Sequence, residues 1–224
     1  MFTVSTEQLR LMFPNAGARL DAHLPFIPLA LDRGQIDTPE RVAAFLAQLA
    51  HESGEYRYME ELASGEDYEG RADLGNTQPG DGVWFKGHGP IQITGRANHK
   101  ACGDALGLDL IEAPTLLCTP GYGTASAVWF WNSRGLSPLA DLGWFTTISK
   151  IVNGGTNGLF DRWQYYNRNR EVLGLSPLYP IGEVDAIRAF QRDHGLVTDG
   201  VVGPKTRAAA AVAGRAAATV IQEA

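Results

Sequence analysis

The segment AHESGEYRYMEEL, residues 50–62, contains four glutamates, a histidine and two tyrosines at the end of an apolar stretch. Just upstream, four apolar side chains recur at positions i, i+3, i+4 and i+7 of a helix: Val42, Phe45, Leu46 and Leu49. At about 100° per residue, Glu52 lies close to Phe45, at the edge of this apolar stripe. Because burial favours the protonated form of a carboxyl group, Glu52 is a candidate general acid.

A second glutamate, Glu61, follows beyond Gly54 and beyond the expected end of this helix. Hydrolysis of a glycosidic bond uses one protonated and one ionised carboxyl group, and an inverting enzyme holds them roughly 6.5–9.5 Å apart. The spacing is compatible with two carboxyl groups that face each other across a groove. Glu61 is then the general base, with its neighbour Glu60 as the alternative.

The same segment allows two other interpretations. His51 and Glu52 begin the pattern H-E-x-x-H of zinc peptidases, but the second histidine is replaced by Glu55, so no metal site is predicted. The other interpretation is a helix end whose glutamates are simply solvated. We assign four glutamates to that kind: Glu55, Glu60, Glu66 and Glu69.

The surrounding sequence predicts a mainly α-helical protein. Thr38 and Pro39 begin the helix that leads to Glu52, because threonine caps helix N-termini and proline suits the first helical position. Further helices are predicted at residues 5–13 and in the later part of residues 89–107, after a short apolar alternation. Three more, each closed by glycine, are predicted at residues 122–135, 141–155 and 159–174. Residues 64–89 contain seven glycines and no apolar period, which predicts a long functional loop.

Composition narrows the classes of partner. The 224 residues carry a net charge of −6, which argues against nucleic acid, because phosphates attract basic surfaces. No run of about 18 apolar residues occurs, so stable membrane insertion is not expected. The N-terminal segment lacks the basic start and apolar core of a secretory signal. The two cysteines, Cys102 and Cys118, either pair or stay reduced.

Three segments resemble glycoside hydrolase family 19, which includes chitinases and phage or bacterial lysozyme-like endolysins: AHESGEYRYMEE, YEGRADLGNTQPGDG and GHGPIQITGRANH. Together with later matches, the resemblance runs from about residue 40 to residue 174. It implies a lysozyme-like helical fold with a substrate groove, Glu52 as the general acid and Glu61 as the general base. It also implies that Thr94 helps to hold the attacking water. His88 departs from the family pattern, which has arginine there.

The resemblance further implies the residues that bind substrate. Gln92 and Asn98 match positions that contact sugar or organise the base, and Asn153 in IVNGG matches the family's substrate-binding asparagine. Neutral amides of this kind suit sugar hydroxyls and N-acetyl groups. Arg162 matches an arginine of the polar network at the base, where its charge would keep Glu61 ionised.

Four aromatic side chains near these segments could form platforms for sugar rings or could simply pack in the core: Tyr56, Tyr58, Trp84 and Phe85. We include Tyr56 and Trp84 among the candidate substrate contacts. The tryptophans on the apolar helices are assigned to the core: Trp129, Trp131 and Trp144.

The C-terminal segment AFQRDHGLVTDGVVGPKT resembles a peptidoglycan-binding module. Asp199 and Gly200 suit a turn, and Thr206 suits a helix start. The helix that usually precedes this motif has little room here, so the segment is either a wall-binding module, truncated or supported by the catalytic domain, or a structural remnant. We therefore expect a catalytic domain at residues 1–174, a linker at 175–182 and a peptidoglycan-binding-like helical segment at 183–224.

These observations predict a monomeric, phage-type endolysin that hydrolyses β-1,4 bonds between the N-acetylated sugars of peptidoglycan glycan strands by inversion. No metal or organic cofactor is expected. Without a signal, such a lysin would accumulate in the bacterial host cytoplasm before release to the cell wall. Two alternatives remain open: a chitinase, since chitin shares the backbone linkage, and a non-catalytic protein that binds cell-wall glycan.

Overall fold

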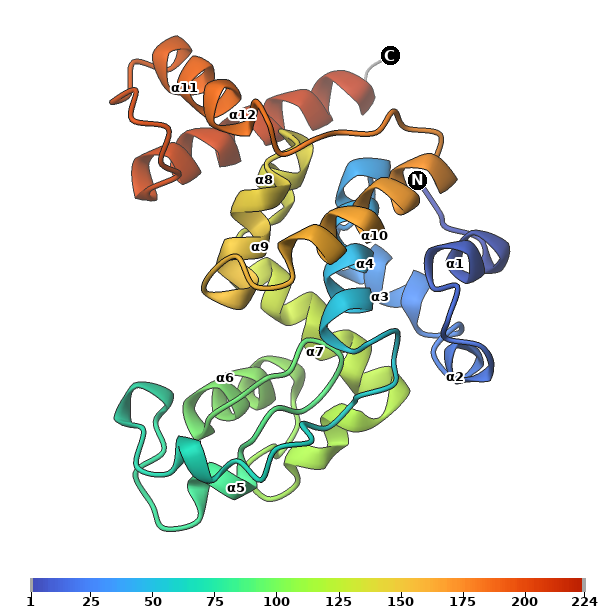
Figure 1. Cartoon of the computed structure of the whole chain (residues 1–224), viewed down its shortest axis with the longest axis vertical. Coiled ribbons are helices and arrows are strands. Elements are labelled where there is room, and N and C mark those ends of the chain that lie inside the picture. The colour runs from blue at the N-terminus through green and yellow to red at the C-terminus, as the bar shows by residue number, and fades with distance from the viewer. Residues whose placement is uncertain (1, 223–224) are drawn as a thin grey trace.

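The computed structural model describes the backbone of residues 2–222 and the side chains of residues 2–214, and it is built almost entirely of helices (Figure 1). The α-helices are α1 (Thr6–Met12), α2 (Ala18–Asp21), α3 (Ile27–Arg33), α4 (Pro39–Glu52), α5 (Asp81–Trp84), α6 (Arg96–Leu106), α7 (Pro120–Ser133), α8 (Ser137–Asp141), α9 (Phe145–Asn153), α10 (Leu159–Val172), α11 (Glu183–Asp193) and α12 (Pro204–Gln222). Short 3₁₀ helices are η1 (Glu66–Tyr68), η2 (Ala72–Leu74) and η3 (Pro114–Cys118). The β-pairing among the described residues consists of isolated bridges that join His88 to Glu60 and Ile93. The prediction of a mainly α-helical protein is confirmed.

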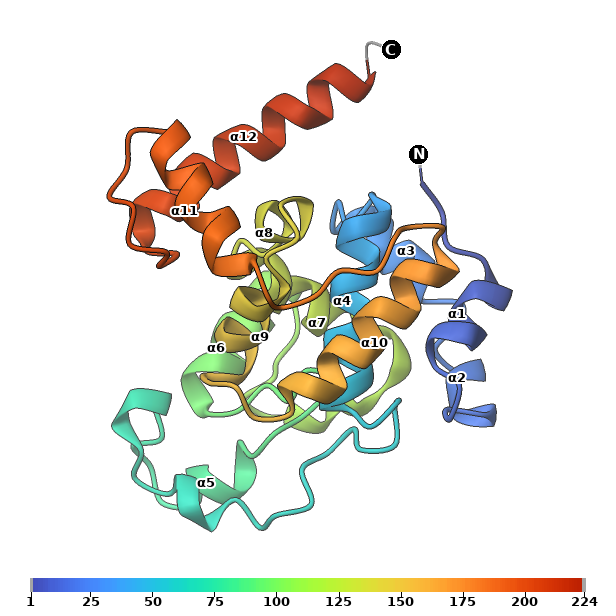
Figure 2. The same cartoon turned by 45° about the horizontal axis from the view of Figure 1, so that its top comes forward.

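Helix α4 is the centre of the fold. It begins as predicted, with the Thr38 hydroxyl accepting from the Arg41 amide at 3.2 Å and with Pro39 in the first helical position. Every residue from Val42 to Ala50 is buried, because small alanines let neighbouring helices approach on the faces beside the apolar stripe. Helix α10 lies along α4 in both views (Figures 1 and 2).

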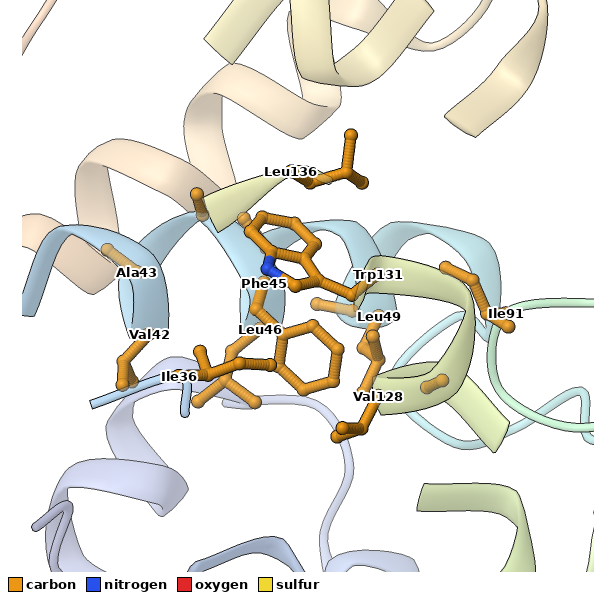
Figure 3. Close-up of a cluster of buried hydrophobic side chains, with 14 of the residues drawn as sticks. Ile36, Val42, Ala43, Phe45, Leu46, Leu49, Ile91, Val128, Trp131 and Leu136 are labelled. Carbon is orange, nitrogen blue, oxygen red and sulfur yellow. The ribbon is translucent and has the colours of Figure 1, made fainter. Parts of the chain in front are cut away.

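The core on the other side of α4 is formed with α7. The rings of Phe45 and Trp131 meet edge to face with centroids 5.5 Å apart, next to Val128 and Leu49 (Figure 3). Such aromatic pairs contribute about 0.5–1.5 kcal/mol beyond the area they bury. The assignment of Trp131 and Trp144 to the core is confirmed, since both are 2% exposed, while Trp129 is only partly buried against it.

The glycine-rich stretch 64–89 contains η1, η2 and α5, and a polar network holds it in place. The buried Asp81 carboxylate accepts from the backbone amides of Thr77 and Gln78 and pairs with Arg96 of α6. The Arg96 hydrogen bond lowers the pKa of Asp81. Hydrogen bonds therefore help to order this stretch, which shows no apolar period.

The C-terminal helices α11 and α12 lie against α8 and α9 (Figures 1 and 2). Residues 175–182 contain no helix, and Asn167 of α10 holds them through two hydrogen bonds to the Leu178 backbone, at 2.8 and 2.9 Å. The predicted division at residues 174 and 183 stays a prediction. Cys102 and Cys118 are free thiols. Within residues 2–222, no helix combines the length and apolar character needed to cross a bilayer.

Buried histidines are a second feature of the core. His23 is 5% exposed and stacks on the Tyr56 ring with centroids 4.0 Å apart, and His99 is fully buried on α6. Burial lowers the pKa of each histidine from 6.5 to about 4. Both side chains are therefore neutral in the folded protein at neutral pH.

This burial predicts that the protein loses stability as the pH falls from about 6.5 to about 4. In that range the unfolded chain binds protons at His23 and His99 that the folded protein does not bind, so the free energy of unfolding decreases. At pH 5 the burial of each histidine should lower the free energy of unfolding by about 1–2 kcal/mol relative to pH 7.5. Urea denaturation at several pH values measures this, and His23→Phe, which keeps an aromatic ring against Tyr56, should lose less stability on acidification. Equal losses in the two proteins would contradict the prediction.

Candidate active site

Glu52 is the last residue of α4, and its carboxyl group lies in a polar cluster. The Arg162 guanidinium on α10 donates to Glu52 Oε1 and also to Gln48 Oε1, one turn earlier on α4. Gln48 in turn donates to Ser149 Oγ on α9 at 2.9 Å. The side chain of Glu52 is 18% exposed, whereas Arg162 is almost fully buried. Three helices therefore fix the position of this carboxyl group.

The location of Arg162 corrects the sequence-based prediction. Arg162 was expected beside Glu61, where it would keep the base ionised, but it pairs with Glu52 instead. Gln48 and Glu52 lie on the face of α4 that packs against α10, so the arginine of α10 meets these two side chains. Glu52 thus accepts a hydrogen bond from a buried guanidinium and does not lie only at the edge of an apolar stripe.

Glu61 is held by different elements. Its backbone amide donates to the Gly87 carbonyl, the Gly87 amide donates to Glu61 Oε2, and both distances are 2.8 Å. The Tyr68 hydroxyl donates to Glu61 Oε1 at 2.9 Å. Burial, followed by this contact with Glu61, raises the pKa of Tyr68. With one donor on each oxygen, the carboxylate of Glu61 has a fixed orientation.

Gly87 brings Gln92 next to Glu61. A Cβ atom at position 87 would lie 2.5 Å from Gln92 Oε1 and 3.2 Å from Glu61 Oε2, so a larger residue there would displace the end of the Gln92 side chain. Gln92 has a left-handed backbone, with φ of +55°. Its side-chain Nε2 donates to the Gly89 carbonyl at 2.9 Å. Gln92 thus lies beside Glu61 at Gly87, and its role, contacting sugar or organising the base, stays a prediction.

Thr94 and Asn98 continue this chain of hydrogen bonds. The Thr94 hydroxyl donates to the Gln92 carbonyl at 3.0 Å, and Asn98 Nδ2 donates to the Thr94 carbonyl at 2.7 Å. Because its proton is used in this way, the Thr94 oxygen has lone pairs left to accept a hydrogen bond from water. The structure thus brings Glu61, Gln92, Thr94 and Asn98 together, and the roles of Thr94 and Asn98 stay predictions.

Two further candidate contacts lie at other places. Asn153 is the exposed last residue of α9, and its amide donates to the Asn157 carbonyl at 3.3 Å. Trp84 is 52% exposed, and its indole N–H donates to the Ile111 carbonyl at 2.9 Å, against the loop that follows α6. Its role as a sugar platform stays a prediction. Tyr58 is 39% exposed and lies over Gly54, in the segment between Glu52 and Glu61.

Tyr56 is not a substrate platform. It is 3% exposed, between the rings of Phe13 and His23, and burial raises the pKa of its hydroxyl. Phe85 is fully buried as well, beneath the Arg96 guanidinium. The sequence pattern could not separate these two rings from Tyr58 and Trp84, because all four flank the same polar segments.

Glu55, predicted to be solvated, is 1% exposed. Its carboxylate accepts from the Asn15 backbone amide at 2.5 Å, from Asn15 Nδ2 at 2.8 Å and from the Tyr165 hydroxyl at 2.8 Å. Gly54, Glu55 and Tyr56 all have left-handed backbones, with φ from +54° to +61°. The buried contacts of Glu55 hold this strained reversal, which leads the chain from Glu52 to Glu61.

The three other glutamates of this region, Glu60, Glu66 and Glu69, lie at the surface. Glu60 is half-exposed and pairs with Lys86 at 2.8 Å, and this contact lowers its pKa. Glu66 is exposed, and Glu69 is exposed but accepts from the Gly80 and Gly82 amides at the start of α5. Since Lys86 engages Glu60, Glu61 is the better placed base of the two neighbours.

His88 points into the protein. It is 2% exposed, and its Nδ1 lies 3.0 Å from His99 Nε2, while His99 Nδ1 lies 2.9 Å from the Gly95 carbonyl. Since a carbonyl only accepts, His99 Nδ1 carries a proton and His88 donates to His99. Burial lowers the pKa of His88. His88 therefore supports the 87–95 turn from the interior of the protein. It does not supply the groove contact of the family's arginine.

A hollow of about 750 Å³ lies between α3 and α7, and none of the predicted site residues lines it. Aromatic side chains at its wall include Phe26, Tyr122 and Trp129. Among the described residues, no three histidine, cysteine, aspartate or glutamate side chains gather as a metal-binding group. The candidate catalytic residues are therefore Glu52, with Arg162 and Gln48 around it, and Glu61, with Tyr68 and Gln92 around it.

Comparisons with known proteins identify the family of this chain. Residues 20–138 match the family model described as chitinase class I, and residues 184–210 match a putative peptidoglycan binding domain. The endochitinase At2g43620 of Arabidopsis thaliana is 37% identical over 142 residues, which cover 61% of this chain and 49% of that protein. The chain thus spans about half the length of such curated relatives.

Solved structures show the same fold. Chitinase C from Streptomyces griseus HUT6037 superposes with a TM-score of 0.57 at 25% identity, covering 79% of this chain and 78% of that chain. A bacterial family 19 chitinase superposes with a TM-score of 0.58 at 26% identity, covering 79% of this chain and 97% of that chain. The predicted lysozyme-like helical fold is confirmed.

The buried contacts of Glu55 predict a large effect on stability. Glu55→Ala leaves the Asn15 amide and the Tyr165 hydroxyl without their acceptor and should lower the free energy of unfolding by about 2–4 kcal/mol. Glu66→Ala, which removes an exposed carboxylate from the same region, should change it by less than about 0.5 kcal/mol. Urea denaturation at pH 7.5 measures both. Similar midpoints for the two variants would show that the Glu55 contacts contribute little.

Proposed function

Because the chain belongs to the chitinase class I family, we propose that it hydrolyses β-1,4 bonds between N-acetylated sugars. The observation that carries this proposal is the pair of separately held carboxyl groups. Glu52 is fixed by Arg162 at the end of α4, and Glu61 is fixed by Tyr68 and Gly87 beside Gln92. Two carboxyl groups with different environments are what acid and base catalysis of glycoside hydrolysis requires.

The proposed reaction is a single displacement with inversion. Glu52 gives its proton to the oxygen of the leaving sugar as the glycosidic bond breaks. Glu61 removes a proton from a water molecule, which attacks the anomeric carbon from the opposite face. Thr94 accepts a hydrogen bond from this water, and Gln92 and Asn98 bind the sugar. Glu52 ends ionised and Glu61 protonated, so proton exchange with solvent restores the starting state.

Arg162 has a role in this scheme that differs from the predicted one. Its guanidinium keeps the Glu52 carboxyl group in one orientation and joins it to Gln48. A carboxyl group that is held in place needs no rearrangement to reach the leaving oxygen, which lowers the barrier to proton transfer. Arg162 is thus a positioning residue for the acid.

Chitin is the substrate that the relatives favour, since they are named as endochitinases and chitinases. This reverses the order of the sequence-based interpretation, which placed peptidoglycan first. Peptidoglycan stays the second candidate because residues 184–210 match a putative peptidoglycan binding domain. A role as a lysin, including one that is released from the host cytoplasm to the cell wall, requires peptidoglycan as the substrate.

Substitution of the two carboxyl groups should abolish turnover. Glu52→Gln and Glu61→Gln should each lower kcat by roughly 10²–10⁴-fold, because each removes a group that transfers a proton in the transition state. The assay is release of reducing ends from chitin and from purified peptidoglycan. Glu60→Gln is the matched control and should keep most of the activity, since Lys86 engages its carboxylate away from the reaction.

The pattern of substrates decides between the candidates. Release from chitin alone identifies a chitinase, and release from peptidoglycan, with or without release from chitin, identifies a lysin. If Glu60→Gln and not Glu61→Gln abolishes turnover, the assignment of the base is wrong. If the wild-type protein releases no reducing ends from either polymer, the hydrolase proposal fails and a non-catalytic glycan-binding protein takes its place.

A further inference from the structure

Glu183 fastens the C-terminal segment to the catalytic part of the protein. It is the first residue of α11, and its carboxylate accepts from the Thr146 amide, the Thr147 amide and the Thr147 hydroxyl, each at 2.8 Å. These groups form the first turn of α9, which lacks a side-chain cap at Trp144, the residue that precedes it. Glu183 is only 9% exposed. A residue far along the chain therefore caps α9.

The cap is strong for physical reasons. The first amides of a helix have no partner within the helix, and the helix dipole makes this end positive. A carboxylate there satisfies two amides and one hydroxyl at once, with charge-assisted hydrogen bonds. Glu183→Gln keeps the shape of the side chain but removes the charge, and it replaces one acceptor oxygen by an NH₂ donor that faces donors.

Other contacts lie beside this cap. The Phe190 ring of α11 meets the Trp144 ring edge to face, with centroids 5.2 Å apart. Gly214 of α12 approaches α8 so closely that a Cβ atom there would lie 3.1 Å from Asp141 Oδ2. Asp141 is itself held by Arg41 of α4 at 2.8 Å. The segment is thus attached at three places to helices of the catalytic part.

Within residues 183–214, the part of the segment whose side chains the structure describes, the buried apolar side chains are Ile187 and Ala210. A polar side chain, Gln191, donates to Asp199, Thr206 and the Val201 carbonyl between the helices. A fold with so few buried apolar groups gains stability from docking on a larger body. This favours the alternative in which packing on the catalytic domain supports the module.

The docked segment and the candidate site share helix α9. Glu183 caps its first turn, while Ser149 in the middle accepts from Gln48 and Asn153 ends it. A nine-residue helix is about 13 Å long. Helix α9 therefore connects the C-terminal segment rigidly, and over a short distance, to the residues that hold Glu52.

We propose that Glu183 is a positioning residue that fixes the C-terminal segment on α9, so that the segment and the catalytic site bind one polymeric glycan as a single rigid surface. The proposal rests on the proposed function for its substrate class. A freely tethered module binds polymer anywhere within reach of its linker. A fixed module raises the local concentration of one particular stretch of glycan at the site, which benefits long chains and leaves short ones unaffected.

The test compares Glu183→Gln with wild type and with Asp185→Asn, a matched control whose side chain is 84% exposed on the same helix. Hydrogen exchange of the Thr146 and Thr147 amides reports on the cap, and we expect exchange to rise about tenfold or more in Glu183→Gln. Pelleting with insoluble chitin and with purified peptidoglycan measures polymer binding without turnover. Hydrolysis of a soluble N-acetylglucosamine hexamer and of the insoluble polymers measures the effect of chain length.

We expect Glu183→Gln to bind and hydrolyse at least one insoluble polymer about three- to thirtyfold less well, while kcat/KM on the hexamer stays within about twofold of wild type. Asp185→Asn should match wild type throughout. Unchanged amide exchange in Glu183→Gln would overturn the cap, and equal losses on hexamer and polymer would show a general structural role. If the wild type hydrolyses nothing, the proposed function fails on its own, and amide exchange and pelleting still decide the proposal.

Discussion

The buried guanidinium of Arg162 is the interaction on which the rest of the structure depends. A guanidinium that is almost fully buried needs hydrogen-bond acceptors, and Glu52 supplies one, with Gln48 as a second. The pairing requires α10 to lie along α4 in one register, and Gln48 extends the constraint to Ser149 of α9. The long core helix, the helix with the arginine and the helix that carries Asn153 are thereby tied together around one carboxyl group.

The second constraint is the reversal between Glu52 and Glu61. Left-handed residues at 54, 55 and 56 turn the chain sharply after α4, and buried contacts of Glu55 and Tyr56 hold the strained backbone. The chain then enters the segment that meets Gly87 and His88, where Glu61 gains its donors. The base is thus positioned by loops with a polar network, and the acid by helices and a hydrogen bond from a buried arginine. Each carboxyl group has a support of its own, which suits two groups with opposite tasks.

Much of this arrangement was predictable where the information is local. Thr38 and Pro39 fix the start of α4, Ser5 and Gln8 form the capping box of α1, and Gly154 ends α9, because caps and turns depend on adjacent residues. Helices α3 and α8 were not predicted, since each is too short to show a full apolar period. The prediction failed at Glu55, Tyr56 and Arg162 because their partners come from distant segments. Spacing indicates a helix face, but it does not say which side chain of another helix meets that face.

The central claim is that Glu52 and Glu61 act as acid and base on opposite faces of one sugar, with a water molecule on the side of Glu61. The stereochemistry of the product tests it most directly. Proton NMR of the first products released from a β-1,4-linked N-acetylglucosamine hexamer should show the α-anomer at the new reducing end before mutarotation, because a single displacement inverts the anomeric carbon. Initial release of the β-anomer would contradict the account, since it would require a covalent or substrate-assisted double displacement.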